Sequence, residues 1–272
     1  MAAVTASIPS AVRGRAGFGG IVRSEFTKLK SVRSTWWTLL VLMVLSIGFS
    51  ALICAVTNAN WKNLSGSSKL TFDATSTSLG GIGFLGPLVI AVLGSLVITS
   101  EYSTGMIRTS LTVMPRRSQL FAAKAAVFGT ATLVLAVIAS FVSFFLGQAL
   151  LGSHSASLSH QGTMRAIVGT AIYVTLCGLL AYGIGVILRH TAGTITLVVG
   201  LLFVLPIIVQ LFPSSWHDAI VRWLPTSAGD AISTTVGGNA HMFSPWDEMI
   251  LLVVYVAVIL IAGATLFRTR DA

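Results

Sequence analysis

Six long apolar stretches between residues 37 and 268 constrain this chain more than any other feature of its sequence. About 20 consecutive apolar residues suffice to cross the hydrocarbon core of a bilayer as a helix. Only 9% of the 272 residues are charged, whereas a soluble domain carries about 25%. The sequence therefore predicts an all-α integral membrane protein with six transmembrane helices. Too few residues remain outside these helices for a second soluble domain.

The apolar stretches divide the chain into a tail, an interfacial helix, a transmembrane domain and a second short tail. Residues 1–17 are rich in Ala, Ser and Gly, and we expect them to be disordered. The interfacial helix covers 18–36, the six-span domain 37–268 and the second tail 269–272. The spans are expected at about 37–57, 79–99, 121–150, 166–188, 193–212 and 248–267.

The basic residues between the spans predict which way the chain crosses the membrane. Thirteen of the 17 lysines and arginines fall in the two termini and the gaps after the second and fourth spans, when Lys124 at the start of the third span is counted with the gap before it. The other gaps hold four: Lys62, Lys69, Arg165 and Arg222. Since basic loops stay on the cytosolic side, both termini are expected in the cytosol. The basic residues that give the net charge of +9 then face anionic lipid headgroups, and we do not expect the chain to bind nucleic acid.

Residues 18–36 have the pattern of an amphipathic helix in the inner headgroup layer. Its predicted apolar face is formed by Phe18, Ile21, Val22, Phe26, Leu29 and Val32. The opposite face is basic and hydroxylic, as in helices that lie at the membrane surface. Glu25 and Arg33 fall at the edges of the apolar face, from which we expect their charges to reach the headgroups.

Two further patterns concern packing and the outer surface. The spans are rich in glycine, which lets helices approach closely in lipid, and Pro87 and Pro206 are expected to kink the second and fifth spans. Residues 215–224 predict a short helix on or in the outer leaflet, followed by a turn-rich segment over 226–247.

The segment EYSTGMIRTSLTVMPRR, residues 101–117, follows the second span on the predicted cytosolic side. On a helical wheel its apolar residues cover one half as far as residue 114, and Pro115 ends the pattern. An amphipathic helix joined rigidly to a span can transmit a push from a cytosolic partner. The alternative is an interfacial connector without a partner, and the pattern alone leaves both open.

The order of these parts resembles the permeases of ATP-binding-cassette exporters, in the type-2 group of bacterial six-span half-transporters. RSEFTKLKSVRSTWW (23–37) resembles the basic helix that leads into their first span. EYSTGMIRTSLTVMPRR resembles their cytosolic coupling helix between spans 2 and 3. LPTSAGDAI (224–232) resembles the outer segment before their last span.

The resemblance implies a multi-pass subunit of the bacterial cytoplasmic membrane that pairs with a second copy or a related permease. It also implies two cytosolic ATPase subunits. The residues placed at or near the coupling helix are Glu101, Tyr102, Gly105, Met106 and Arg108. Those placed on the helix that flanks the ATPase are Arg23, Glu25 and Lys28.

The chain itself has no sequence for binding nucleotide phosphates. It contains neither GxxxxGK[ST] nor any Gly-Lys pair, so we expect ATP and magnesium on the partner subunit and no cofactor, catalytic residue or metal site here. It is therefore not expected to be an enzyme. The five histidines form no metal-binding pair by spacing.

These patterns favour an exporter permease over two alternatives. One is a membrane anchor or assembly factor that transports nothing. The other is an ion-coupled carrier, which is disfavoured because the central parts of the spans contain no Asp or Glu. Apolar spans with hydroxyl groups and glycines favour a hydrophobic or amphipathic cargo.

Overall fold

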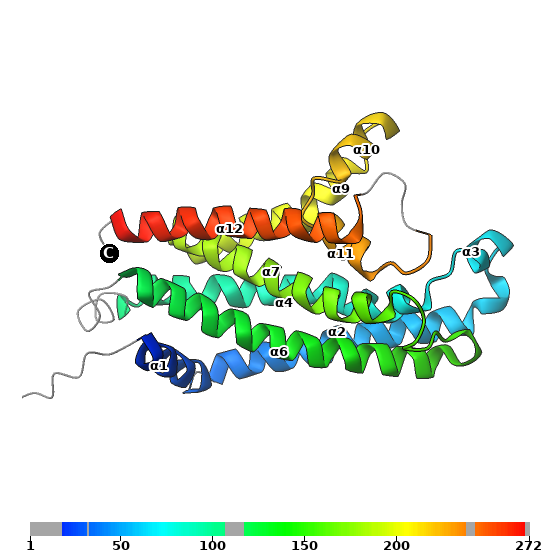
Figure 1. The fold of residues 1–272 in the computed structure, drawn as a ribbon, viewed down its shortest axis with the longest axis horizontal. Coiled ribbons are helices and arrows are strands. Elements are labelled where there is room, and N and C mark those ends of the chain that lie inside the picture. The colour runs from blue at the N-terminus through cyan, green and yellow to red at the C-terminus, as the bar shows by residue number, and fades with distance from the viewer. Residues whose placement is uncertain (1–17, 32, 107–116, 238–242, 270–272) are drawn as a thin grey trace, which may run out of the picture.

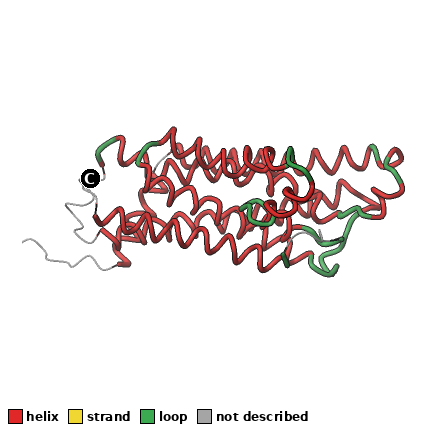
Figure 2. The backbone as a smooth tube through the Cα atoms, turned by 90° about the horizontal axis from the view of Figure 1, so that it is seen from above, coloured by secondary structure: helices red, strands yellow, loops and turns green. Residues whose placement is uncertain are grey.

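The computed structural model describes residues 18–31, 33–106, 117–237 and 243–269. Throughout these ranges the chain forms helices joined by loops, without a β-strand (Figure 2). The tail predicted over residues 1–17 and most of that predicted over 269–272 lie outside the described residues, as do residues 107–116 of the expected coupling helix.

Six helical spans are long and apolar enough to cross a membrane, which confirms the predicted number. They are α2 (Arg33–Ala59), α4 (Ala74–Ser103), α6 (Arg117–Leu151), α7 (Thr163–Leu188), the α8–α9 pair and α12 (Pro245–Thr269). Outside the spans lie α1 (Phe18–Ser31), α3 (Gly66–Leu70), α10 (Ser214–Val221) and α11 (Ser227–Ser233). Most of the helices extend beyond the predicted spans by about one turn.

The spans run roughly along one long axis, so that connections gather at two opposite ends (Figure 1). The helix α1, the end of α4, the start of α6 and the end of α12 lie at one end, called here the α1 end. The helix α3 lies at the other, called the α3 end. An even number of crossings places the two ends of the described chain together, as the charge pattern requires.

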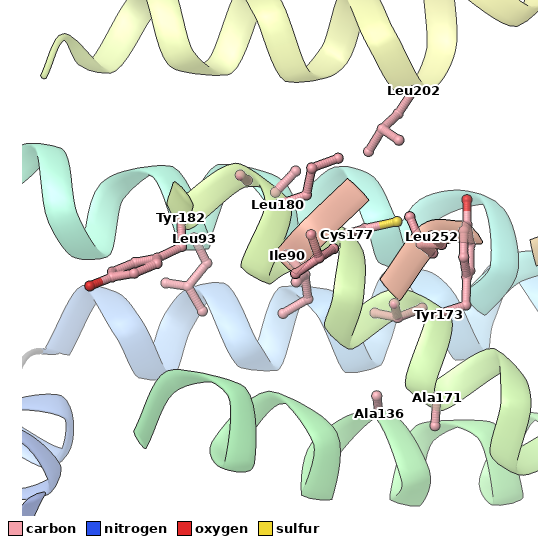
Figure 3. Packing of buried hydrophobic residues seen from close by; sticks show 14 of the residues in the cluster. Ile90, Leu93, Ala136, Ala171, Tyr173, Cys177, Leu180, Tyr182, Leu202 and Leu252 are labelled. Carbon is pink, nitrogen blue, oxygen red and sulfur yellow. The ribbon is translucent and has the colours of Figure 1, made fainter. Parts of the chain in front are cut away.

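Helix α7 is the centre of the bundle. In the most apolar 18-residue stretch of α7, 72% of the residues are buried, against 22% in the corresponding stretch of α12. Its side chains interdigitate with those of α4, where Cys177 and Leu180 lie near Ile90 and Leu93 (Figure 3). The outer spans keep many apolar side chains exposed, as lipid-facing helices do.

Close approach of α4 and α7 depends on facing glycines. A Cβ atom added at Gly94 would collide with the backbone carbonyl of Gly178. We therefore expect Gly94→Ala to lower the free energy of unfolding by about 2 kcal/mol, because overpacking moves backbone atoms. Thermal unfolding in detergent measures this. The matched control is Gly48→Ala, since Gly48 lies in α2 with open space around an added Cβ; an equal loss in both variants would contradict the prediction.

The fifth span is irregular just before its proline. Helix α8 (Thr191–Val199) passes into a π-helical turn, Gly200–Val204, and then into α9 (Leu205–Val209), with Pro206 in its first turn. Pro206 has no N–H to donate to the carbonyl one turn earlier, and the wider π-helical turn accommodates this missing hydrogen bond. The irregularity therefore lies on the N-terminal side of Pro206. Beyond it, α9 and α10 lean away from the other helices (Figure 1).

Candidate functional site: a charge cluster at the α1 end

Helix α1 packs on the first turns of α6 through one narrow face. Ile21 is buried against Leu120 and Ala123 of α6. Glu25, one turn further along α1, faces the same way and is only 4% exposed. The prediction that Glu25 reaches the headgroups from the edge of the apolar face is therefore wrong. Phe18 and Phe26 remain about half exposed, where lipid can cover them.

Glu25 is buried because Lys124 of α6 meets it inside the protein. The Lys124 Nζ lies 2.6 Å from Glu25 Oε2 and 2.7 Å from Glu101 Oε1, at the end of α4. Lys28 adds a second cation, 2.8 Å from Glu25 Oε1 and 3.8 Å from Glu101 Oε1. These four residues, called here the Lys124 cluster, carry no net charge and join α1, α4 and α6.

Electrostatics in the cluster hold both of its α1 members in their charged forms. Burial alone would raise the pKa of Glu25, but the charge and hydrogen bond of Lys124, with those of Lys28, lower it overall. Burial would lower the pKa of Lys28, yet its hydrogen bond to Glu25 and the two carboxylate charges raise it. Opposite charges within hydrogen-bond distance thus outweigh desolvation here.

The structure brings together three of the eight residues singled out in the sequence. Glu25 and Lys28 meet Glu101, which lies in the last turn of α4 and is buried. For the fourth member, Lys124, the charge pattern predicts only a contribution to the orientation of the chain in the membrane. The signal was present, since Lys124 falls inside the third apolar stretch, where an ionisable side chain points to a specific partner.

The other predicted coupling residues continue from the end of α4. Tyr102 is half-buried, with the Arg189 guanidinium carbon 5.0 Å from its ring centroid. Gly105 has a φ of 70° and ends the helix, so the continuous helix expected from residue 101 to 114 is interrupted there. Met106 is 48% exposed, Arg23 is exposed on α1, and Arg108 lies outside the described residues.

A second polar assembly holds the segment before the last span at the α3 end. The sequence predicts turns over 226–247, but residues Ser227–Ser233 form α11, packed on α7 and α12. Glu248 of α12 accepts hydrogen bonds from Ser227 Oγ at 2.6 Å and the Phe243 N–H at 3.2 Å. A helix of seven residues between polar connections is too short to show a helical repeat of apolar residues, so the sequence pattern does not predict it.

The loop after α11 is held by the residue that begins α4. Asp73 caps α4 by accepting from the Ser76 N–H at 2.9 Å. The same carboxylate accepts from the Thr235 hydroxyl at 2.9 Å and the Val236 N–H at 3.0 Å. Among the residues that the structure describes, no three His, Cys, Asp or Glu side chains are grouped as metal ligands.

Asp230 on α11 gives stability a pH dependence. Surrounding protein removes water from its carboxylate and raises the pKa from 3.8 to about 6, although the side chain stays partly open to solvent. The folded protein then holds the proton more tightly than the unfolded chain, so ionisation lowers stability as pH rises from 3.8 through about 6.

We therefore expect Asp230→Asn to stabilise the protein at about pH 8 and to change little at about pH 4. We expect the free energy of unfolding at about pH 8 to rise by only about 1 kcal/mol, because solvent screens the charge of an exposed carboxylate and reduces the effect of its pKa shift. Thermal unfolding of wild type and variant at both pH values measures the difference. The same gain at both would contradict it.

Comparison with known proteins bears on the whole bundle. A family model described as ABC-2 family transporter protein matches residues 21–213, well over half of the chain. The match includes the Lys124 cluster and the first five spans. No curated protein matches the sequence.

Proposed function

Because this chain belongs to the ABC-2 family transporter proteins, a family of membrane permeases, we propose that it is the permease subunit of an ATP-driven exporter. In this proposal it pairs with a second copy or a related permease and is driven by two separate cytosolic ATPase subunits. The α1 end faces the cytosol of a bacterial cell, in keeping with the thirteen basic residues expected there.

The Lys124 cluster is the observation that carries the ATP-coupling part of the proposal. It lies at the base of the segment after Gly105, which the ATPase would contact. A displacement of that segment reaches Glu101 first and, through Lys124 Nζ at 2.7 and 2.6 Å, Glu25 of α1. Charge-assisted hydrogen bonds at these distances are strong and directional, so α1, the end of α4 and the first turns of α6 move as one unit.

ATP acts in this scheme by binding one shape of the complex more tightly than the other. The ATPase subunits close on nucleotide, displace the segment after α4 and thereby favour one arrangement of the spans. Cargo passes between the two permease chains. The apolar and hydroxyl-bearing spans favour a hydrophobic or amphipathic cargo.

Affinity purification of the full-length chain from its native membranes tests the proposal. We expect a separate subunit with a GxxxxGK[ST] motif to co-purify, with vanadate-sensitive ATP hydrolysis in the preparation. An anchor or assembly factor would bring down no such ATPase. An ion-coupled carrier, reconstituted alone, would transport in response to an ion gradient without nucleotide. Either of these results would refute ATP coupling.

A further inference from the structure

Arg189 occupies a backbone position at which helices usually place glycine. It follows the last residue of α7 with a φ of 55°, and its N–H donates to the Gly185 carbonyl at 2.9 Å. Among the described residues it alone, apart from glycines, has a positive φ. A side chain is unfavourable in this conformation, and glycine would end the helix with less strain. A favourable contact of the arginine side chain must therefore offset the backbone strain.

The side chain reaches the last turn of α4. Its guanidinium carbon lies 5.0 Å from the centroid of the Tyr102 ring, within the range of a cation–π interaction. Tyr102 directly follows Glu101, the α4 member of the Lys124 cluster. A second contact lies beside it, because Thr191 Oγ1 donates to Thr99 Oγ1 at 2.9 Å. The connection from α7 to α8 is thus tied twice to the end of α4.

The span that begins at this connection is less enclosed by the other helices of the chain than α7 is. In the fifth span 22% of the most apolar window is buried, against 72% in α7. Its helix is interrupted by the π-turn Gly200–Val204, and such turns mark sites where helices bend. A displacement at its first residue can therefore reach α9 without unpacking α7.

We propose that Arg189 is a positioning residue that transmits movement of the α4 end to the fifth span, α8–α9. This inference rests on the proposed function, since the ATPase would supply the movement. The Lys124 cluster carries the same movement to α1 and α6, so residues 99–102 distribute it to both sides of α4.

The test compares Arg189→Gly with the unmodified residue in the complex purified with its ATPase. Leu211→Cys, in both backgrounds, provides a labelling site just past α9, where Leu211 is 82% exposed. Cys54 and Cys177 are fully buried, so an environment-sensitive maleimide reports on Leu211→Cys. The readout is the change in fluorescence on adding ATP and vanadate.

We expect Arg189→Gly to reduce this change about fivefold, the scale of one lost coupling contact. Thermal stability and ATPase content should stay as they were, because glycine suits the left-handed position. Tyr102→Leu should give a similar loss, and the double variant should lose no more than either single variant. Tyr102→Phe, which keeps the ring face, should retain most of the change.

Three results would overturn the inference. One is a full nucleotide response in Arg189→Gly. Another is loss of thermal stability or of the ATPase in that variant, which would make Arg189 a structural residue. The third is a Leu211→Cys complex that hydrolyses ATP without any response, which would leave the proposed function intact. A preparation without ATPase would instead refute both.

Discussion

Replacing Lys124 by methionine is expected to lower the free energy of unfolding by about 3 kcal/mol, the largest stability effect we predict. Methionine has a similar length and packs well, so the loss is chiefly electrostatic. The substitution leaves two buried carboxylates, Glu25 and Glu101, with Lys28 as the one remaining cation of the Lys124 cluster. Unfolding in detergent should shift by about 10 °C for a chain of this size.

Two further variants separate the buried charge from the lysine side chain itself. Adding Glu25→Gln to Lys124→Met removes the excess negative charge, so the double variant should recover a large part of the loss. Lys62→Met is the control, because Lys62 is exposed near the α3 end and should change stability by less than about 0.5 kcal/mol. Equal unfolding temperatures for Lys124→Met and Lys62→Met would contradict the buried cluster.

The spans could be predicted from the sequence because lipid imposes one simple rule. Every crossing needs a long apolar helix, and such stretches are visible without knowing what packs against them. The same rule explains why the central place of α7 could not be predicted. Its hydropathy resembles that of the other spans, but it is far more buried. The difference arises from contacts such as that between Gly94 and Gly178, which no periodicity reveals.

The candidate site could be predicted only in part, because its members come from three helices. The family resemblance points to Glu25 and Glu101 on two separate segments, and Lys124 joins them across 99 and 23 residues of sequence. Amphipathicity placed Glu25 at the rim of the apolar face, on the assumption that lipid alone covers α1. In the structure α6 covers part of that face and supplies a cation, which reverses the expected exposure.

Replacing Gly105 by tryptophan is expected to lower the amount of ATPase that co-purifies with the chain about tenfold, if the segment after α4 is the contact. Among the residues that the structure describes, none lies within 4 Å of a Cβ atom built at Gly105, so a bulky side chain there would occupy space that a partner would fill. Losing about 1.4 kcal/mol of binding free energy is enough for this change. The measurement is quantitative mass spectrometry of the purified complex, with ATP hydrolysis recorded in parallel.

Two controls distinguish a blocked contact from a damaged fold. Gly105→Asn accepts the left-handed φ of 70° more readily than other residues and adds little bulk, so it should keep the ATPase. Gly152→Trp imposes a similar strain, at a φ of 56° and also with open space, but at the α3 end. Only Gly105→Trp should then lose the ATPase. Both variants strain the backbone in the same way, but they lie at opposite ends of the molecule. If Gly152→Trp loses as much ATPase, or Gly105→Trp loses none, the segment after α4 is not where the ATPase binds.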